Sequence, residues 1–137
     1  ANGPVADLDG DGRAELAFVA DGADGEGSLE IWRYRDGSLE LVAALPDFAS
    51  RATDGAAWTG AHAATDLTGD KLVDLVVPAA DRLSLRIVSI VDGEVTEAER
   101  IELPAEAVTG VLVLPVQGRP RPALLVGLAD GTLALAR

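Results

Sequence analysis

The residues of this chain best suited to chemistry are the acids of segment 7–15, which reads Asp-Leu-Asp-Gly-Asp-Gly-Arg-Ala-Glu. Carboxylates fall at its first, third, fifth and ninth positions, namely Asp7, Asp9, Asp11 and Glu15. A hard divalent cation takes about six to eight oxygen ligands, and a loop of alternating acids and glycines can supply several of them. The backbone carbonyl of Arg13, at the seventh position, is a further predicted ligand. Carboxylates this close repel one another, so a bound cation is the expected counter-charge.

A second segment, 66–74, repeats the pattern 59 residues later. Its predicted ligands are Asp66, Thr68, Asp70, the carbonyl of Leu72, and Asp74. Each segment leads directly into an apolar run, and a repeated spacing in a repeated context indicates an internal repeat. The alternative for either segment is a solvated acidic turn, because Asp-Gly pairs are also common in hairpins.

The residues that follow each loop distinguish between classes of calcium site. An EF-hand loop needs a bidentate acid at its twelfth position and then a helix. Here the twelfth positions are Phe18 and Val77, inside apolar runs rich in β-branched residues that predict strands. The loops therefore join strand to strand, which excludes EF-hand and dockerin-like arrangements.

The two loops differ in their expected affinity. The first offers four carboxylates and has Gly12 at the sixth position, where the backbone is expected to need a positive φ. The second offers three carboxylates and has Lys71 at that position. Because a non-glycine residue at positive φ is strained and the ammonium group repels a cation, the sequence predicts tighter binding at the first loop.

The loop motif, placed ahead of a short apolar strand, resembles the FG-GAP (VCBS) repeat of integrin-α-like calcium-binding β-propellers. Trp58, Thr59 and Gly60 stand where that repeat often carries Phe-Gly. In this family each repeat forms one four-stranded propeller blade, with calcium in the loop between the first two strands. The resemblance implies two structural Ca²⁺ sites in this chain.

The predicted fold class is all-β, a β-propeller segment of two four-stranded blades plus most of a third. Residues 1–45 are expected to form the first blade, with the calcium loop 7–15. Residues 46–103 would form a linker and the second blade, with the calcium loop 66–74. Residues 104–137 would form a degenerate, incomplete third blade without a calcium loop. Its ligand positions fall on non-acidic residues, namely Pro115, Gln117, Arg119 and Ala123.

Composition excludes several classes of function. The formal charge of −12 argues against electrostatic binding to nucleic acid or to anionic membranes. No apolar run reaches the roughly 18 residues of a membrane span. The chain has no cysteine, which excludes disulfides and thiolate chemistry. A hydrophobic content of 48% is typical of a packed protein rather than a disordered one.

The sequence contains no catalytic motif, and its one histidine, His62, lies in a segment of small residues without a partner acid or serine at a motif spacing. We therefore expect a non-catalytic, calcium-stabilised module for binding or adhesion, in an extracellular or periplasmic setting. The alternative is a propeller portion or accessory domain of a secreted enzyme whose active residues lie outside this chain. Expected partners are an unidentified protein or glycan ligand, and either further propeller blades or a second copy of the chain.

Overall fold

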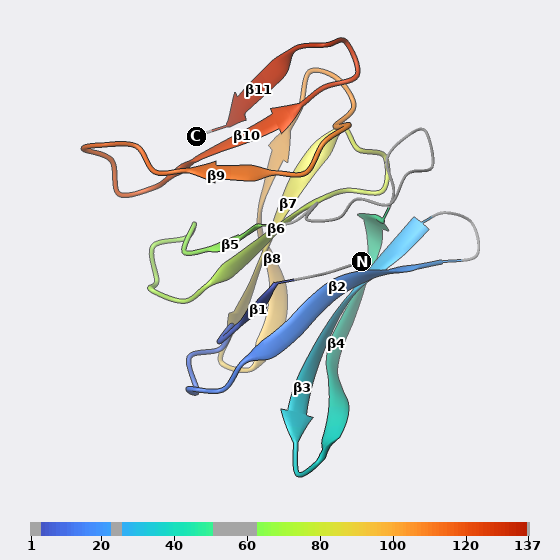
Figure 1. The fold of residues 1–137 in the computed structure, drawn as a ribbon, viewed down its shortest axis with the longest axis vertical. Coiled ribbons are helices and arrows are strands. Elements are labelled where there is room, and N and C mark those ends of the chain that lie inside the picture. The colour runs from blue at the N-terminus through green and yellow to red at the C-terminus, as the bar shows by residue number, and fades with distance from the viewer. Residues whose placement is uncertain (1–3, 23–25, 51–62, 137) are drawn as a thin grey trace.

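The computed structural model describes residues 4–22, 26–50 and 63–136, which form three antiparallel sheets. Figure 1 shows the second sheet, green to yellow, between the blue first sheet and the red third sheet. The first sheet comprises β1 (Val5–Ala6), β2 (Glu15–Asp21), β3 (Glu26–Arg35) and β4 (Ser38–Ala49). The second comprises β5 (Ala63–Thr65), β6 (Asp74–Pro78), β7 (Ser84–Val91) and β8 (Glu94–Glu102). The third comprises β9 (Leu112–Leu114), β10 (Ala123–Gly127) and β11 (Leu133–Ala136).

Within each sheet the strands follow one another in chain order, each paired antiparallel with the next. Tight turns make this possible: Asp36 and Gly37 join β3 to β4, and Asp92 and Gly93 join β7 to β8. All four of these residues have positive φ, which the turn between two twisted strands requires. Four-stranded meanders of this kind are the blades of β-propellers. The predicted all-β fold of two four-stranded blades and a three-stranded third is confirmed.

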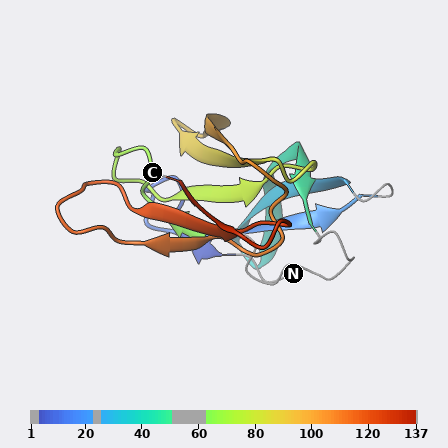
Figure 2. The same ribbon diagram turned by 90° about the horizontal axis from the view of Figure 1, so that it is seen from above.

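The burial of the second strand in each sheet reflects its place in the stack. In β2, buried and half-buried residues alternate, because one face packs on the second sheet and the other does not. In β6 every residue is buried, because a sheet covers each face. Figure 2 shows the same three sheets from above, where their strands overlap in the view.

Two apolar clusters hold the sheets together. One joins the first and second sheets and includes Leu29 and Ile31 on one side and Leu75 and Val77 on the other. The other joins the second and third sheets and includes Val76, Ile87, Leu124 and Val126. Leu75 and Val76 belong to different clusters, as expected for neighbouring residues of a strand that point to opposite faces.

A polar link reinforces the contact between the first two sheets. The guanidinium of Arg86, on β7, lies 3.9 Å from the ring centroid of Phe48, on β4. Its Nη1 also donates to the carbonyls of Pro46 and Asp47, at 2.7 and 3.1 Å. β4 extends to Ala49, so the first sheet reaches into the segment that the sequence indicated as a linker.

Some expectations fall outside the described residues. Trp58, Thr59, Gly60 and His62 are among them. Among the described residues, no helix has the length and apolar character needed to cross a membrane.

Candidate metal centres

Both acid-rich loops connect the first two strands of a four-stranded sheet, and each ends on a buried acid. The first runs between β1 and β2 and the second between β5 and β6. The last acid of each loop opens the following strand, and both acids, Glu15 and Asp74, are 0% exposed. A fully buried carboxylate is costly unless hydrogen bonds or a cation compensate its charge.

The first position of each loop organises the turn. The two oxygens of Asp7 accept hydrogen bonds from the backbone N–H groups of Gly10 and Gly12, at 2.8 and 2.9 Å. Asp66 does the same for Gly69 and Lys71, at 2.6 and 3.0 Å. Each carboxylate oxygen retains a lone pair after one such bond, so these acids can still ligate a metal ion.

The later positions also match between the loops. Asp11 accepts from the N–H of Arg13, and Asp70 from that of Leu72, both at 2.8 Å. The ninth-position acid closes each loop on its second residue: Glu15 accepts from Leu8 N–H at 2.9 Å, and Asp74 from Leu67 N–H at 2.7 Å. The N–H of Thr68 also donates to Asp74, at 2.8 Å.

The backbone at the sixth position is as the sequence predicted. Gly12 has φ of 84° and Lys71 has φ of 72°. The turn therefore requires the left-handed conformation at this position in both loops, and the second loop adopts it with a side chain that disfavours it.

The structure brings six of the predicted ligands together in two groups. The first is Asp7, Asp9 and Glu15, and the second is Asp66, Asp70 and Asp74; within each group, one oxygen per residue lies within 4.8 Å of the others. Clustered carboxylate oxygens are the donor set that hard divalent cations take, so both groups could hold a metal ion. The fifth-position Asp11 lies outside the first group, whereas its counterpart Asp70 belongs to the second.

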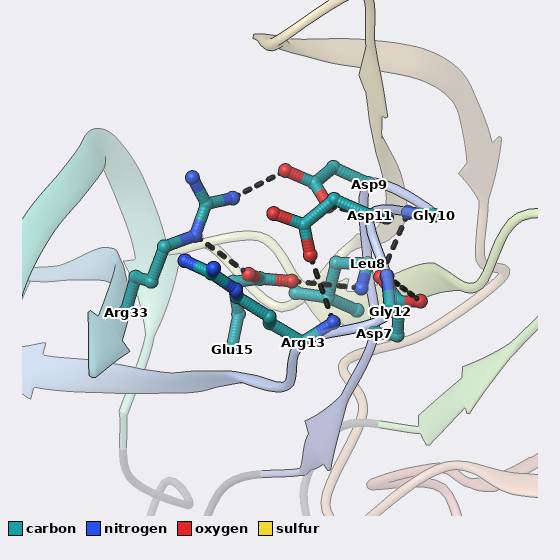
Figure 3. A network of polar contacts seen from close by, with 9 residues as sticks. All are labelled: Asp7, Leu8, Asp9, Gly10, Asp11, Gly12, Arg13, Glu15 and Arg33. Carbon is teal, nitrogen blue, oxygen red and sulfur yellow. Dashed lines mark hydrogen bonds and ion pairs between the residues drawn. The ribbon is translucent and has the colours of Figure 1, made fainter. Parts of the chain in front are cut away.

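Arg33 is a member of the first site that the sequence reading missed. It lies on β3 directly opposite Glu15 in the strand register. Its Nε donates to Glu15 Oε1 at 2.9 Å, and its Nη2 pairs with Asp9 Oδ2. Figure 3 shows the guanidinium of Arg33 between Glu15, at the start of β2, and Asp9, in the loop before it. The hydrogen bond with Glu15 is the main cause that raises the pKa of Arg33 above its ordinary value, so the group is charged at any ordinary pH.

The second site has a neutral residue at the matching place. Ser89 follows Val88, which pairs with Leu75, so it lies opposite Asp74 as Arg33 lies opposite Glu15. Its hydroxyl donates to Asp74 Oδ1. Among the described residues, no arginine or lysine forms an ion pair with the three acids of the second group.

Each loop is also part of the contact with the next sheet. Leu8, at the second position of the first loop, belongs to the cluster between the first and second sheets. Leu67, its counterpart, belongs to the cluster between the second and third. Arg121, from the third sheet's side, donates to the carbonyl of Leu67. The conformation of each loop therefore bears on how two sheets pack.

Comparison with known protein families agrees with this description. A family model described as "FG-GAP-like repeat" matches residues 7–77, which include both loops and more than half of the chain. No curated protein matches the chain.

Proposed function

The chain belongs to the FG-GAP-like repeat family, and we propose that it is a calcium-stabilised, non-catalytic propeller module for binding or adhesion outside the cytoplasm. The observation that carries this proposal is the recurrence of the carboxylate group, with a fully buried acid in each copy. The repeat units that we propose are residues 1–45, 46–103 and 104–137, the first two with a calcium loop.

Calcium suits these loops better than other common cations. All candidate side-chain ligands are oxygens, which favours hard ions, and the loops have neither cysteine nor histidine for zinc. Magnesium prefers a tight octahedral shell and keeps its waters, whereas calcium accepts an irregular set of carboxylates and carbonyls. Asp7, Asp9 and Glu15 would hold one ion, and Asp66, Asp70 and Asp74 the other. Asp11, Thr68 and the carbonyls of Arg13 and Leu72 remain proposed additional ligands.

The role that we propose for the metal is structural. The loop acids accept hydrogen bonds from the backbone of their own loops, which favours a role in shaping the turn over a role in catalysis. An ion would neutralise the clustered charge and tie the loop to the start of the following strand. The abundance of calcium outside the cytoplasm supports an extracellular or periplasmic location.

The outer faces of the first and third sheets carry exposed apolar residues, and these support a proposal about the partners of the chain. Val5, Leu16, Trp32 and Leu41 are successive neighbours across the first sheet, and Val5 and Leu41 are exposed. Leu112, Leu125 and Leu135 are successive neighbours across the third sheet, and Leu112 and Leu135 are exposed. Leu16 corresponds to Leu75, which packs on a neighbouring sheet in the second blade. We propose that these faces pack against further blades or a second copy, and that a protein or glycan ligand binds the assembled module.

A calcium titration followed by calorimetry and thermal melting tests the metal sites. Ions that bind only the folded state stabilise it by about 2.7 kcal/mol at a hundredfold excess over Kd. We expect calcium to raise Tm, and magnesium to raise it much less. Asp70→Asn should remove one binding event, whereas Glu94→Gln, an exposed acid outside the loops, should remove none. Equal effects of the two ions, or no effect of either, would contradict the proposal.

Light scattering at micromolar concentration tests the proposed contacts of the outer faces. The wild-type chain should be larger than a monomer, and Leu135→Lys should reduce its mass. A wild-type chain that is monomeric with calcium present would contradict self-association.

A further inference from the structure

Among the ion pairs of the described residues, those that reach the acids of a candidate metal centre are formed by the side chain of Arg33. It bridges two of the three carboxylates in the first group, Asp9 and Glu15, from the neighbouring strand. The side chain of Arg33 is 16% exposed, that of Asp9 15% and that of Glu15 0%. Water therefore screens these charges less than it would on an open surface.

A guanidinium and a divalent cation would draw on the same two carboxylates here, those of Asp9 and Glu15. Nε takes one oxygen of Glu15, and Nη2 takes one oxygen of Asp9. The other oxygen of Glu15 already accepts the N–H of Leu8. A metal ion held by this group would lie within a few ångströms of the guanidinium, where like charges repel strongly at the low effective dielectric of a partly buried site.

The second loop provides the comparison without this cation. Its acids at the first and ninth positions accept the corresponding backbone hydrogen bonds, but Ser89 stands in place of the arginine and donates one neutral hydroxyl. In the described residues, the carboxylates of this group have backbone N–H groups and that hydroxyl as donors. The first group thus forms ion pairs with a cationic side chain, whereas the second group forms none within the part of the chain that the structure describes.

We propose that Arg33 is a resident cation of the first loop, which stabilises the loop without metal and competes with calcium for Asp9 and Glu15. This inference rests on the proposed calcium binding. The first loop keeps its conformation with and without calcium, whereas the conformation of the second loop depends on the bound ion. The arginine thereby offsets the advantage that four carboxylates and Gly12 give the first loop.

The test measures calcium affinity and metal-free stability in the whole chain. Asp70→Asn silences the second loop, so that the calorimetric signal reports the first loop alone. On that background, Arg33→Gln should tighten calcium binding about tenfold, because a positive charge next to the ion is removed. The same variant should melt at a lower temperature than its parent in chelator, because Asp9 and Glu15 lose their counter-charge. The matched control is Arg35→Gln, an exposed arginine of the same strand, which should change neither value.

If Arg33→Gln does not fold in chelator, Arg33→Lys replaces it in this test. It keeps the charge but loses the two-pronged geometry of the guanidinium, so calcium affinity should rise by about threefold. If calcium binding is unchanged or weaker in the variant tested, Arg33→Gln or its replacement Arg33→Lys, the proposed role of Arg33 is wrong. The proposed calcium binding of the chain would still stand. Absence of any calcium signal from the wild-type chain would instead overturn the proposed function, and this inference with it.

Discussion

The two acid-rich loops share a backbone design and differ in how their charge is balanced. In both, the first acid shapes the turn and the ninth acid closes it. In the first loop, Arg33 pairs with Asp9 and Glu15. In the second, the buried Asp74 faces the hydroxyl of Ser89. A repeated motif can therefore preserve the geometry of a site while its electrostatics, and with them its dependence on an ion, diverge.

The largest expected effect is the removal of the buried acid from each loop in the absence of metal. Glu15→Ala leaves the N–H of Leu8 without its acceptor and breaks one of the two pairs of Arg33, which should cost about 3–4 kcal/mol of unfolding free energy. Asp74→Ala also loses hydrogen bonds, but it relieves repulsion within an uncompensated group and should cost about 1–2 kcal/mol. Urea denaturation in chelator measures both values.

Calcium should change the order of these two costs in unfolding free energy. The cost of Asp74→Ala should rise when calcium is added, because the wild-type protein gains binding energy that the variant has lost. The cost of Glu15→Ala should rise less, since the resident arginine limits what calcium adds at the first loop. Equal costs of the two variants in chelator would show that Arg33 does not make the loops different.

A smaller effect is expected at the sixth position, where the loops differ in backbone strain. Lys71 has φ of 72° and its counterpart Gly12 has φ of 84°. Lys71→Gly should stabilise the metal-free protein by about 1 kcal/mol, since glycine adopts this conformation without the steric cost of a side chain.

Two variants separate strain from charge at this position. Lys71→Gln keeps the strain and removes the charge, so it should tighten calcium binding without raising metal-free stability. Gly12→Lys should introduce the same backbone strain and charge into the first loop and destabilise the metal-free protein by a similar amount. Unchanged stability of Lys71→Gly in a urea titration would show that the loop relaxes around the lysine at no cost.

The backbone of these loops could be predicted from sequence because it depends on residues close together in the chain. Alternating acids, glycines and a following apolar strand determine the turn, the strand order and the positive φ at position six. Strand lengths were less predictable, because pairing partners extend them: β4 runs to Ala49, and its Phe48 forms an isolated bridge to Ala79, the residue that follows β6.

Arg33 could not be predicted in the same way. It is 18 residues from Glu15 in the chain, beyond a turn region whose length differs between the two repeats. Arg33 and Arg35 both lie on β3, and only the register of β3 against β2 decides which one faces Glu15. Once the strand register is known, comparing the residues opposite the two ninth-position acids, Arg33 and Ser89, identifies Arg33 as a member of the first site.

The smallest expected effect concerns Glu97, an acid outside the loops that is balanced by arginine as Glu15 is. It pairs with Arg86 and Arg100 on the second sheet. The hydrogen bond from Arg100 is the main cause that lowers the pKa of Glu97 below its ordinary value. A lowered pKa in the folded state stabilises the fold above the unfolded-state pKa, and this contribution is lost as pH falls through the lowered value.

Glu97→Gln should therefore reduce stability at pH 7 by less than about 1 kcal/mol, because solvent screens the pair with the exposed Arg100. The difference from the wild-type protein should shrink as the pH falls from the ordinary pKa of a glutamate, about 4.3, towards the lowered pKa of folded Glu97, because the unfolded wild-type chain binds a proton there before the folded one does. Urea denaturation in chelator at several pH values measures this difference and separates it from the acids of the loops. A difference that stays constant down to pH 3 would mean that Glu97 acts through packing, and that charge balance by arginine matters less in this protein than the comparison of the two loops implies.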